Sequence, residues 1–160
     1  MKTFLTVFAV SSFLFLGAGP ADAGPERIVA RAIGMNAPVV YVDVKNGKLQ
    51  IGHNLHVVYA AQGGDPPCDQ SGSTMYAGHA WRAGNGVADK WLQLRRGDII
   101  SVRGCRFKVT RKEVWDDGRD VGSLSTPDGS PRIVLYGCKA DDYNYATVVF
   151  ARKLGKNKPF

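Results

Sequence analysis

The 160-residue chain has only three cysteines and three histidines, and it contains no repeat and no low-complexity stretch. No zinc-knuckle spacing accompanies the cysteines and no RNP-like aromatic motif accompanies the basic residues, so the sequence gives little support to a nucleic-acid-binding class. After the N-terminal region, no second apolar run is long enough to suggest a membrane segment. These absences leave one compact domain with an ordinary hydrophobic core as the expected organisation.

Acidic residues are in short supply, because 14 Asp and Glu stand against 21 Lys and Arg, for a formal net charge of +7. The simplest interpretation of this excess is a solvated basic face without a partner. The alternative is contact with an anionic envelope or membrane surface, because a basic domain outside the cytoplasm is attracted to anionic surfaces. The basic excess lies in the tail at 152–158 and in a central group of Arg95, Arg96, Arg103, Arg106, Lys108, Arg111 and Lys112.

The N-terminus has the features of an export signal. Lys2 precedes an apolar run over 4–16, and Pro20 leads to a small-x-small site at 21–23. The run is short for a membrane-spanning helix, so we predict a cleaved signal peptide over 1–23. An uncleaved anchor is the alternative. Both place the domain outside the cytoplasm, either secreted or associated with the cell surface.

Most of the remaining chain has strand patterns. We expect a β-rich domain over 24–154, followed by a basic C-terminal tail at 155–160. Asn46-Gly47 is the clearest hairpin signal, and only 87–94 has a helical pattern. Many short strands with turn-rich connections predict an all-β domain, either an antiparallel or mixed β-barrel or a sandwich. The expected strands are 27–33, 38–44, 48–51, 55–60, 73–77, 98–102, 106–114, 132–136 and 146–152.

A cysteine and a histidine stand at the ends of two strand-like segments. His79 ends the segment 76–79, and Cys138 ends the apolar segment 133–138 far downstream. Acyl-transfer enzymes of the Cys–His type need such a pair, because the thiolate is the nucleophile and a positioned imidazole moves the protons. Taken alone, the pair is also the pattern of a buried strand-end thiol and a surface histidine.

The order of several motifs resembles the sortase family. The run 73–79 is similar to the sortase strand that ends in Ala-Gly-His, and 91–100 is similar to the family's turn of leucine, a basic residue and Gly-Asp. Residues 33–40 and 46–49 match the opening strands, and 133–138 occupies the place of the strand that presents the nucleophilic Cys. The resemblance covers the chain after the signal segment and implies a sortase-like mixed β-barrel with one or two short helices.

The resemblance also implies an activity, that of an exported cysteine transpeptidase. The Cys138 thiolate would attack a backbone carbonyl in the peptide sorting signal of a secreted protein and form a thioester, while His79 protonates the leaving amine. An amine acceptor on a cell-wall precursor or a pilin-like subunit would then resolve the thioester. No cofactor is implied.

Two departures from the family pattern concern this site. Gly137 stands where the family has a Thr before the nucleophile, and Ala146 stands where the family has an Arg on the following strand. That Arg positions substrate and stabilises the oxyanion, so a site without such a donor loses activity. The resemblance therefore also allows a degenerate barrel that binds a peptide or envelope polymer without cleaving it. Candidates for the missing role are Asn144, Arg152 and an Arg of the 103–106 region.

Three cysteines in an exported chain leave one outside any disulfide. Cys68 lies in a proline-rich loop and Cys105 lies at a strand turn. We therefore predict a Cys68–Cys105 disulfide that leaves Cys138 as a thiol. The alternative is that Cys68 and Cys105 are reduced.

No metal site is expected. His53 and His56, together with Asp65 or Asp69, do not match a zinc pattern. Some sortases bind calcium in an acidic loop, but solvated turns account more simply for the acidic residues of this chain. These residues are Asp116, Asp117, Asp120, Asp141 and Asp142.

Overall fold

The computed structural model describes residues 25–64, 66–68, 72–116, 119, 122–124, 131–139 and 142–155. The predicted signal peptide and most of the predicted basic tail lie outside these residues, as do Asp65, Asp69, Asp117, Asp120 and Asp141. In the described part of the chain, no helix is both long and apolar enough to span a bilayer.

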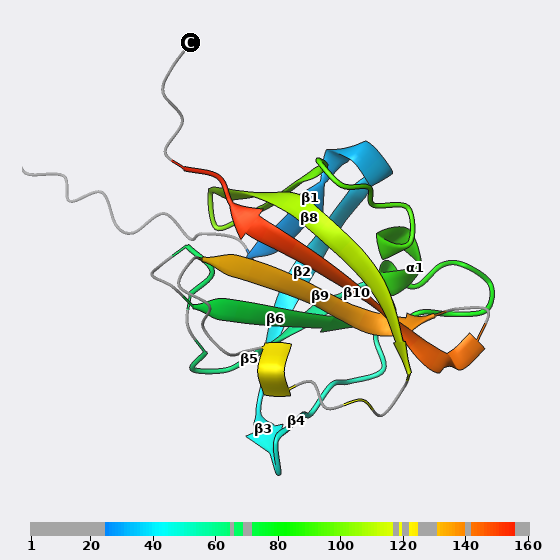
Figure 1. Ribbon diagram of the computed structural model, residues 1–160. Coiled ribbons are helices and arrows are strands. Elements are labelled where there is room, and N and C mark those ends of the chain that lie inside the picture. Colours follow the sequence, from blue (N-terminus) through cyan, green and yellow to red (C-terminus); the bar gives the residue numbers. More distant parts are fainter. Residues whose placement is uncertain are drawn as a thin grey trace, which may run out of the picture.

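Eight strands of the described chain close into a barrel (Figure 1). Most neighbours are antiparallel, but β2 pairs with β5 in parallel, and so does β6 with β9. The predicted all-β mixed barrel is therefore confirmed. In order around the barrel, the strands are β1 (Arg27–Ala30), β2 (Met35–Val42), β5 (Val58–Ala61), β6 (Ser73–Gly78), β9 (Arg132–Lys139), β10 (Asp142–Lys153), β8 (Cys105–Asp116) and β7 (Ile99–Val102).

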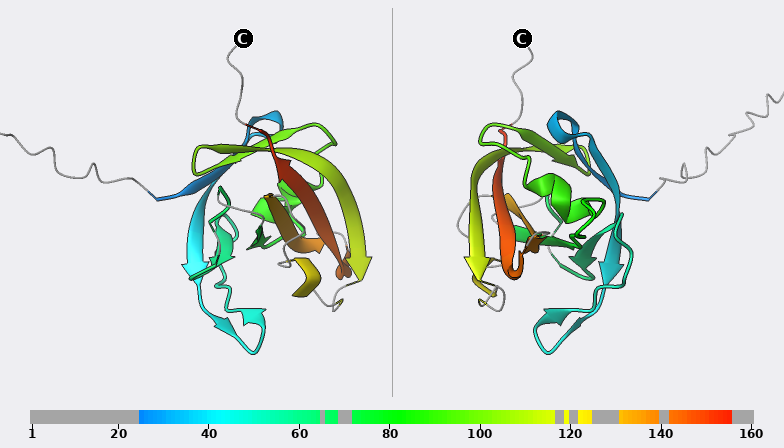
Figure 2. Two further views of the ribbon diagram at one scale, coloured as in Figure 1. Left: turned by 60° about the vertical axis from the view of Figure 1, so that its left-hand side comes forward. Right: turned by 90° about the vertical axis from the view of Figure 1, so that its right-hand side faces the viewer.

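A two-stranded hairpin of β3 (Val44–Lys45) and β4 (Lys48–Leu49) extends from the barrel (Figure 2). Asn46 and Gly47 have positive φ angles of 52° and 71° at its tip. A type I′ turn needs two such residues, and Asn-Gly adopts this conformation at low steric cost. The hairpin expected from the sequence is thus present.

The remaining elements are short. The expected strand 27–33 ends at Ala30, because the chain turns into the 3-10 segment η1 (Arg31–Ile33). Gly34 closes this turn with φ 60°, and its N–H donates to the carbonyl of Arg31 at 3.1 Å. The expected helical stretch 87–94 contains α1 (Val87–Trp91), and a second 3-10 segment, η2, covers Gly122–Leu124.

Apolar side chains pack on both sides of the barrel wall. Residues alternate in direction along each strand, so one set fills the interior, where α1 lies across one end of the barrel (Figure 2). The largest fully buried interior side chains are Ile28, Met35, Val58, Tyr76, Trp91, Leu94, Ile100, Val102, Phe107, Val109, Ile133 and Leu135. A smaller cluster on the other face of β8, β9 and β10 contains Trp115, Val134, Val148, Phe150 and Leu124 of η2.

A pair of glycines lets α1 pack directly on the barrel wall. Gly78 and Gly137 stand opposite each other in the parallel pairing of β6 with β9. A Cβ added to Gly137 would lie 2.5 Å from the Cβ of Ala88 and 2.7 Å from the carbonyl oxygen of Gly78. A Cβ added to Gly78 would lie 2.6 Å from Val87 and 2.8 Å from Trp91. Gly137 therefore makes room for α1, which accounts for the absence of the family's Thr.

Substitution of Gly137 by Ala should destabilise the fold by about 1–3 kcal/mol, because the added methyl overpacks the contact between α1 and β9. Chemical denaturation monitored by circular dichroism measures this change. Gly64→Ala is the matched control, since a Cβ there meets nothing closer than 3.4 Å. Equal stability of the two variants would contradict the packing role of Gly137.

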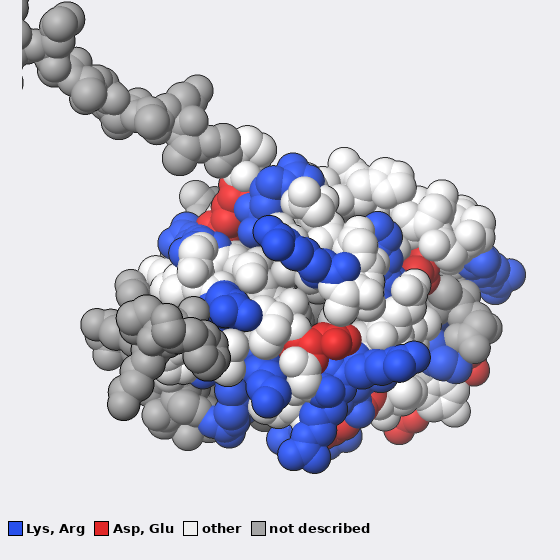
Figure 3. Space-filling model, turned by 90° about the horizontal axis from the view of Figure 1, so that it is seen from above, with Lys and Arg blue, Asp and Glu red and all other residues white. Residues whose placement is uncertain are grey.

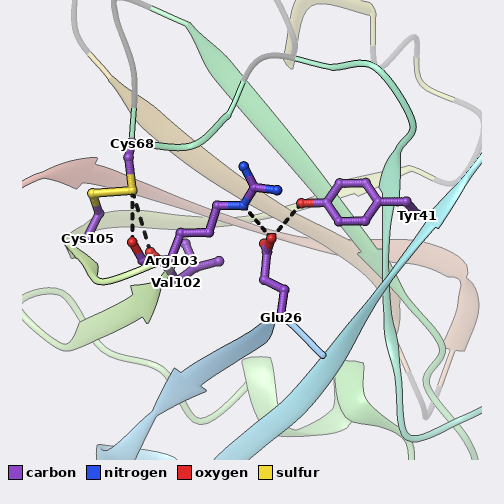
Figure 4. Close-up of polar contacts among 6 residues, drawn as sticks. All are labelled: Glu26, Tyr41, Cys68, Val102, Arg103 and Cys105. Atoms are coloured by element: carbon purple, nitrogen blue, oxygen red, sulfur yellow. Dashed lines mark hydrogen bonds and ion pairs between the residues drawn. A yellow bond between two sulfur atoms is a disulfide. The ribbon is translucent and has the colours of Figure 1, made fainter. Parts of the chain in front are cut away.

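A polar cluster ties the start of β1 to the turn between β7 and β8 (Figure 4). Glu26 Oε2 accepts a hydrogen bond from Tyr41 Oη at 2.8 Å and forms an ion pair with Arg103. The turn that carries Arg103 leads into Cys105, which is joined to Cys68 by a disulfide with 5.8 Å between the Cα atoms. The disulfide and the ion pair thus hold the same turn.

This cluster gives a prediction about pH. Burial and the neighbouring Glu26 carboxylate raise the pKa of Tyr41 to about 12. Because the ordinary value is about 10, the neutral phenol contributes stability below pH 10, and that contribution is lost as pH rises toward 12.

Ultraviolet titration of the folded protein should show a late component from the Tyr41 phenol near pH 12, while the buried Tyr76, whose pKa burial raises further, stays neutral there. Tyr41→Phe should remove this late component, and Glu26→Gln should move it to lower pH. Tyr145→Phe is the matched control, because Tyr145 and Tyr41 are both 39% exposed. Loss of the late component in the Tyr145 variant would contradict the assignment.

Candidate functional site

The register of the strands brings the predicted catalytic pair together. Gly78 pairs with Gly137 across the parallel strands β6 and β9, so the next residues along, His79 and Cys138, emerge side by side at the same end of the sheet. Both side chains line one pocket of about 470 Å³. The other lining residues are His53, Leu55, Ala80, Trp81 and Tyr143.

The His79 ring is held in a defined orientation. Its Nε2 lies 2.6 Å from the carbonyl oxygen of Gly52, and a carbonyl only accepts, so Nε2 carries a proton and donates. The edge of the ring contacts Tyr59, with 6.0 Å between the ring centroids. Nδ1 is therefore the nitrogen left to exchange protons in the pocket.

The backbone of His79 is held by the segment around α1. The carbonyl oxygen of His79 accepts the N–H of Ala88 at 3.0 Å. Asp89 Oδ2 accepts the N–H groups of Gly86 and Trp81 at 2.7 and 3.1 Å, which fixes the loop after His79 to the start of the helix. A Cβ on Gly86 would lie only 2.4 Å from the His79 carbonyl oxygen, so this close approach requires glycine.

Aromatic and apolar side chains form the walls of the pocket. Trp81 lines the pocket and is 51% exposed, which is unusual for so large an apolar side chain. Tyr143 forms another wall, and the guanidinium carbon of Arg82 lies 5.5 Å from its ring centroid. A pocket with a nucleophile, an imidazole and apolar walls suits a peptide side chain next to a scissile bond.

The structure places Ala146 directly opposite Cys138 on β10. Ala146 is fully buried and has no side-chain donor, so the strand position of the family's Arg offers nothing to an oxyanion. Across the next pairing, Ala146 stands opposite Trp115 on β8. Residues directly opposite one another share a face, so Cys138, Ala146 and Trp115 form a row on one side of the sheet.

The structure shows where three of the candidates for the missing Arg lie. Arg152 pairs with Arg132, six positions along β10 from Ala146 and about 20 Å away, so its side chain cannot reach Cys138. Arg103 is engaged by Glu26. Asn144 lies on β10, two residues before Ala146, which stands opposite Cys138. Its backbone N–H and its side-chain amide both donate to Asp142 Oδ1, at 3.0 and 2.9 Å.

Sequence reasoning missed several features of the pocket. The sequence indicates His53 only as a candidate metal ligand, yet in the structure it lines the same pocket as His79. His56 is exposed, and its N–H donates to Asn54 Oδ1 at 2.9 Å. Among the described residues, no group of three His, Cys, Asp or Glu side chains is placed to hold a metal ion. The carbonyl of Gly52, which orients His79, has no signal in the sequence.

A separate basic face lies over β1, β7 and β8 (Figure 3). Two adjoining hollows of about 620 and 570 Å³ share Asp98 on this face, and Arg106 lines one of them while Lys112 lines the other. Neither hollow shares a residue with the pocket of Cys138. The exposed cations of the basic face are Arg31, Arg95, Arg96, Arg106, Lys108 and Lys112.

Comparisons with known proteins bear on the fold. No family model and no curated protein matches the chain. Among solved structures, sortase A of Listeria monocytogenes matches with a TM-score of 0.65 and 17% identity, over 81% of this chain and 86% of that chain. Sortase C-1 of Actinomyces oris has a TM-score of 0.65 and 19% identity, over 82% of this chain and 72% of that chain.

A sortase D5 transpeptidase of Clostridium perfringens also matches, with a TM-score of 0.61 and 16% identity, over 82% of this chain and 79% of that chain. Three kinds of sortase thus share the architecture of this chain despite low sequence identity. The chain has a sortase-like fold with a divergent sequence.

Proposed function

We propose that the protein is an exported, sortase-like cysteine transpeptidase. One observation carries the proposal: within a sortase-like barrel, strand register sets His79 beside Cys138, and both line the same pocket. A thiol next to an oriented imidazole is a nucleophile with its proton carrier. The substrate class is a peptide sorting signal of a secreted protein. The acceptor is an amine on a cell-wall precursor or on a pilin-like subunit.

The first half of the reaction forms a thioester. The thiolate of Cys138 adds to the carbonyl carbon of the scissile peptide bond, and negative charge develops on the carbonyl oxygen. The C–N bond then breaks, and Nδ1–H of the His79 imidazolium gives its proton to the leaving amine. The hydrogen bond from Nε2 to Gly52 keeps the ring in place while Nδ1 changes its protonation state.

The second half of the reaction transfers the acyl group. The acceptor amine attacks the thioester carbonyl, Nδ1 of His79 takes the proton that the amine loses, and Cys138 leaves as a thiolate. A new amide bond replaces the one that was cleaved. The walls formed by Leu55, Trp81 and Tyr143 reduce access of water, which would otherwise hydrolyse the thioester.

The proposal predicts a covalent intermediate on one cysteine. The purified protein, incubated with a library of sorting-signal-like peptides, should give an acyl adduct on Cys138 by mass spectrometry. Hydroxylamine or triglycine should release the acyl group as the corresponding product. Cys138→Ala should abolish the adduct, and His79→Ala should slow its formation by about 10²–10⁴-fold.

His53→Ala is the matched control, because His53 lines the same pocket but is not placed beside Cys138 by the strand register. Its adduct formation should stay within a few-fold of the wild type. Cleavage that persists unchanged in Cys138→Ala would contradict the proposal.

Ala146 favours a second candidate function. A sortase-like barrel without a donor at this strand position suits a module that binds a peptide or an envelope polymer without cleaving it. In that case folded wild-type protein would bind peptides, with equal affinity in Cys138→Ala, and would form no adduct.

We also propose that the basic face docks on an anionic membrane surface. Among the described residues, the exposed Lys and Arg of this face form no ion pair with an acidic side chain, and Asp98, which lies among them, accepts the backbone N–H of Arg95 at 2.8 Å. The face lies on a different part of the barrel from the Cys138 pocket, so docking leaves the pocket accessible.

Docking is tested with vesicles. Replacing Arg106 and Lys108 together by Gln should weaken binding to vesicles that contain anionic phospholipid by about tenfold at low salt. The matched control replaces Lys45 and Lys48, which lie on the β3–β4 hairpin, and removes the same charge. Equal loss in both variants would mean that net charge, and not the basic face, drives binding.

A further inference from the structure

The segment between β4 and β5 carries the carbonyl that orients His79. Residues 50–57 form neither helix nor strand, yet the Gly52 carbonyl accepts from His79, and His53 and Leu55 line the pocket. A segment without helix or sheet hydrogen bonds is easily displaced. Its position therefore depends on contacts from neighbouring elements.

Tyr59 of β5 supplies one of these contacts. Its hydroxyl accepts the backbone N–H of Asn54 at 3.1 Å and lies 3.5 Å from the carbonyl oxygen of the same residue. A Cβ added to Gly52 would lie 3.1 Å from this hydroxyl, so the phenol also packs closely against the Gly52 backbone. At the other side of the segment, the N–H of Val87 in α1 donates to the carbonyl oxygen of Leu55 at 2.7 Å. One side-chain hydroxyl thus contacts the segment at two positions.

Tyr59 is itself fixed by the barrel wall. It pairs with Ala77 of β6, is only 3% exposed, and packs in a small apolar cluster with Val57 and Ala77. His79 follows Ala77 by two positions, which brings the edge of its ring against Tyr59 with 6.0 Å between the ring centroids. The phenol therefore contacts the imidazole with its ring, and the segment that orients the imidazole with its hydroxyl.

We propose that Tyr59 is a positioning residue for His79. Its hydroxyl holds the segment that presents the Gly52 carbonyl, and this carbonyl keeps the proton of the neutral ring on Nε2. Nδ1 is thereby left to exchange protons with the substrate amine. The effect of Tyr59 on rate rests on the proposed transpeptidase function, whereas its effect on the imidazole is measurable without a peptide.

Tyr76 provides a matched control. It lies on β6 opposite Ala60, is fully buried, and its hydroxyl has no hydrogen-bond partner within the part of the chain that the structure describes. Replacing either tyrosine by Phe removes one buried hydroxyl and keeps the ring. Of the two hydroxyls, only that of Tyr59 is hydrogen-bonded to the segment beside His79.

The first experiment records the ring-nitrogen chemical shifts of ¹⁵N-labelled histidine in the intact protein, with the His79 signals assigned by their absence in His79→Ala. The neutral ring of the wild type should show the well-separated shifts of a single Nε2–H tautomer. Tyr59→Phe should bring the two shifts closer together, because a mobile acceptor lets both tautomers form. Tyr76→Phe should leave them unchanged. Unchanged shifts in Tyr59→Phe, or an equal change in Tyr76→Phe, would overturn the proposal.

Gly52→Ala tests the same contact from the other side and keeps both tyrosines. The new Cβ would press on the Tyr59 hydroxyl from 3.1 Å, so the two His79 shifts should again move together. Gly64→Ala, whose Cβ meets nothing closer than 3.4 Å, should not change them. If Tyr59→Phe is too unstable to measure, this pair decides: a change confined to Gly52→Ala supports the proposal, and no difference between the two variants overturns it.

The second experiment measures formation of the acyl adduct at a saturating concentration of a cleaved peptide. Tyr59→Phe should slow this step by about three- to tenfold, the equivalent of one ordinary hydrogen bond, and Tyr76→Phe should change it by less than about twofold. Adding Tyr59→Phe to His79→Ala should cause no further loss, because a residue that acts through His79 has no effect once His79 is gone. A further loss of the same size would assign Tyr59 a general structural role and overturn the proposal.

The outcomes separate this inference from the proposed function. A normal rate in Tyr59→Phe, together with no adduct in Cys138→Ala, would overturn the inference and leave the transpeptidase function standing. No adduct in the wild type, together with ring-nitrogen shifts that depend on Tyr59, would count against the transpeptidase function and leave the positioning of His79 by Tyr59 standing.

Discussion

The close contact between α1 and the glycine pair of β6 and β9 is the constraint on which the rest of the site depends. With no side chain at Gly78 or Gly137, the helix packs against the strand ends and covers one end of the barrel. The same parallel register then delivers His79 and Cys138 as neighbours. The packing requirement at two glycines and the positions of two reactive side chains are thus consequences of one strand pairing.

The site is assembled from segments that hold one another. The His79 carbonyl oxygen accepts from α1, and its ring donates to Gly52 in the loop before β5. On β10, the residue opposite Cys138 is Ala146, which contributes only a methyl group to the site. Trp115 follows on the next strand, and the guanidinium of Arg119 stacks on its indole ring.

The polar groups elsewhere on the barrel are arranged so that they do not compete with this site. Glu26 engages Arg103, and the disulfide holds the same turn, so a potentially reactive pair of cysteines is removed from the chemistry. The cations of the basic face lie over β1, β7 and β8. The proposed surface attraction and the proposed acyl transfer therefore involve different parts of one small domain.

Local sequence patterns alone were sufficient for the β-rich class, the Asn46-Gly47 hairpin and the short helix at 87–94, because turn chemistry and side-chain alternation act between near neighbours. They were also sufficient to single out Cys138 and His79 as strand-end residues. Only the tertiary structure decided that Gly52 orients His79 and that Ala146 and Trp115 follow Cys138 across the sheet. Each of these depends on pairing between strands far apart in the chain, and a local pattern carries no information about that register.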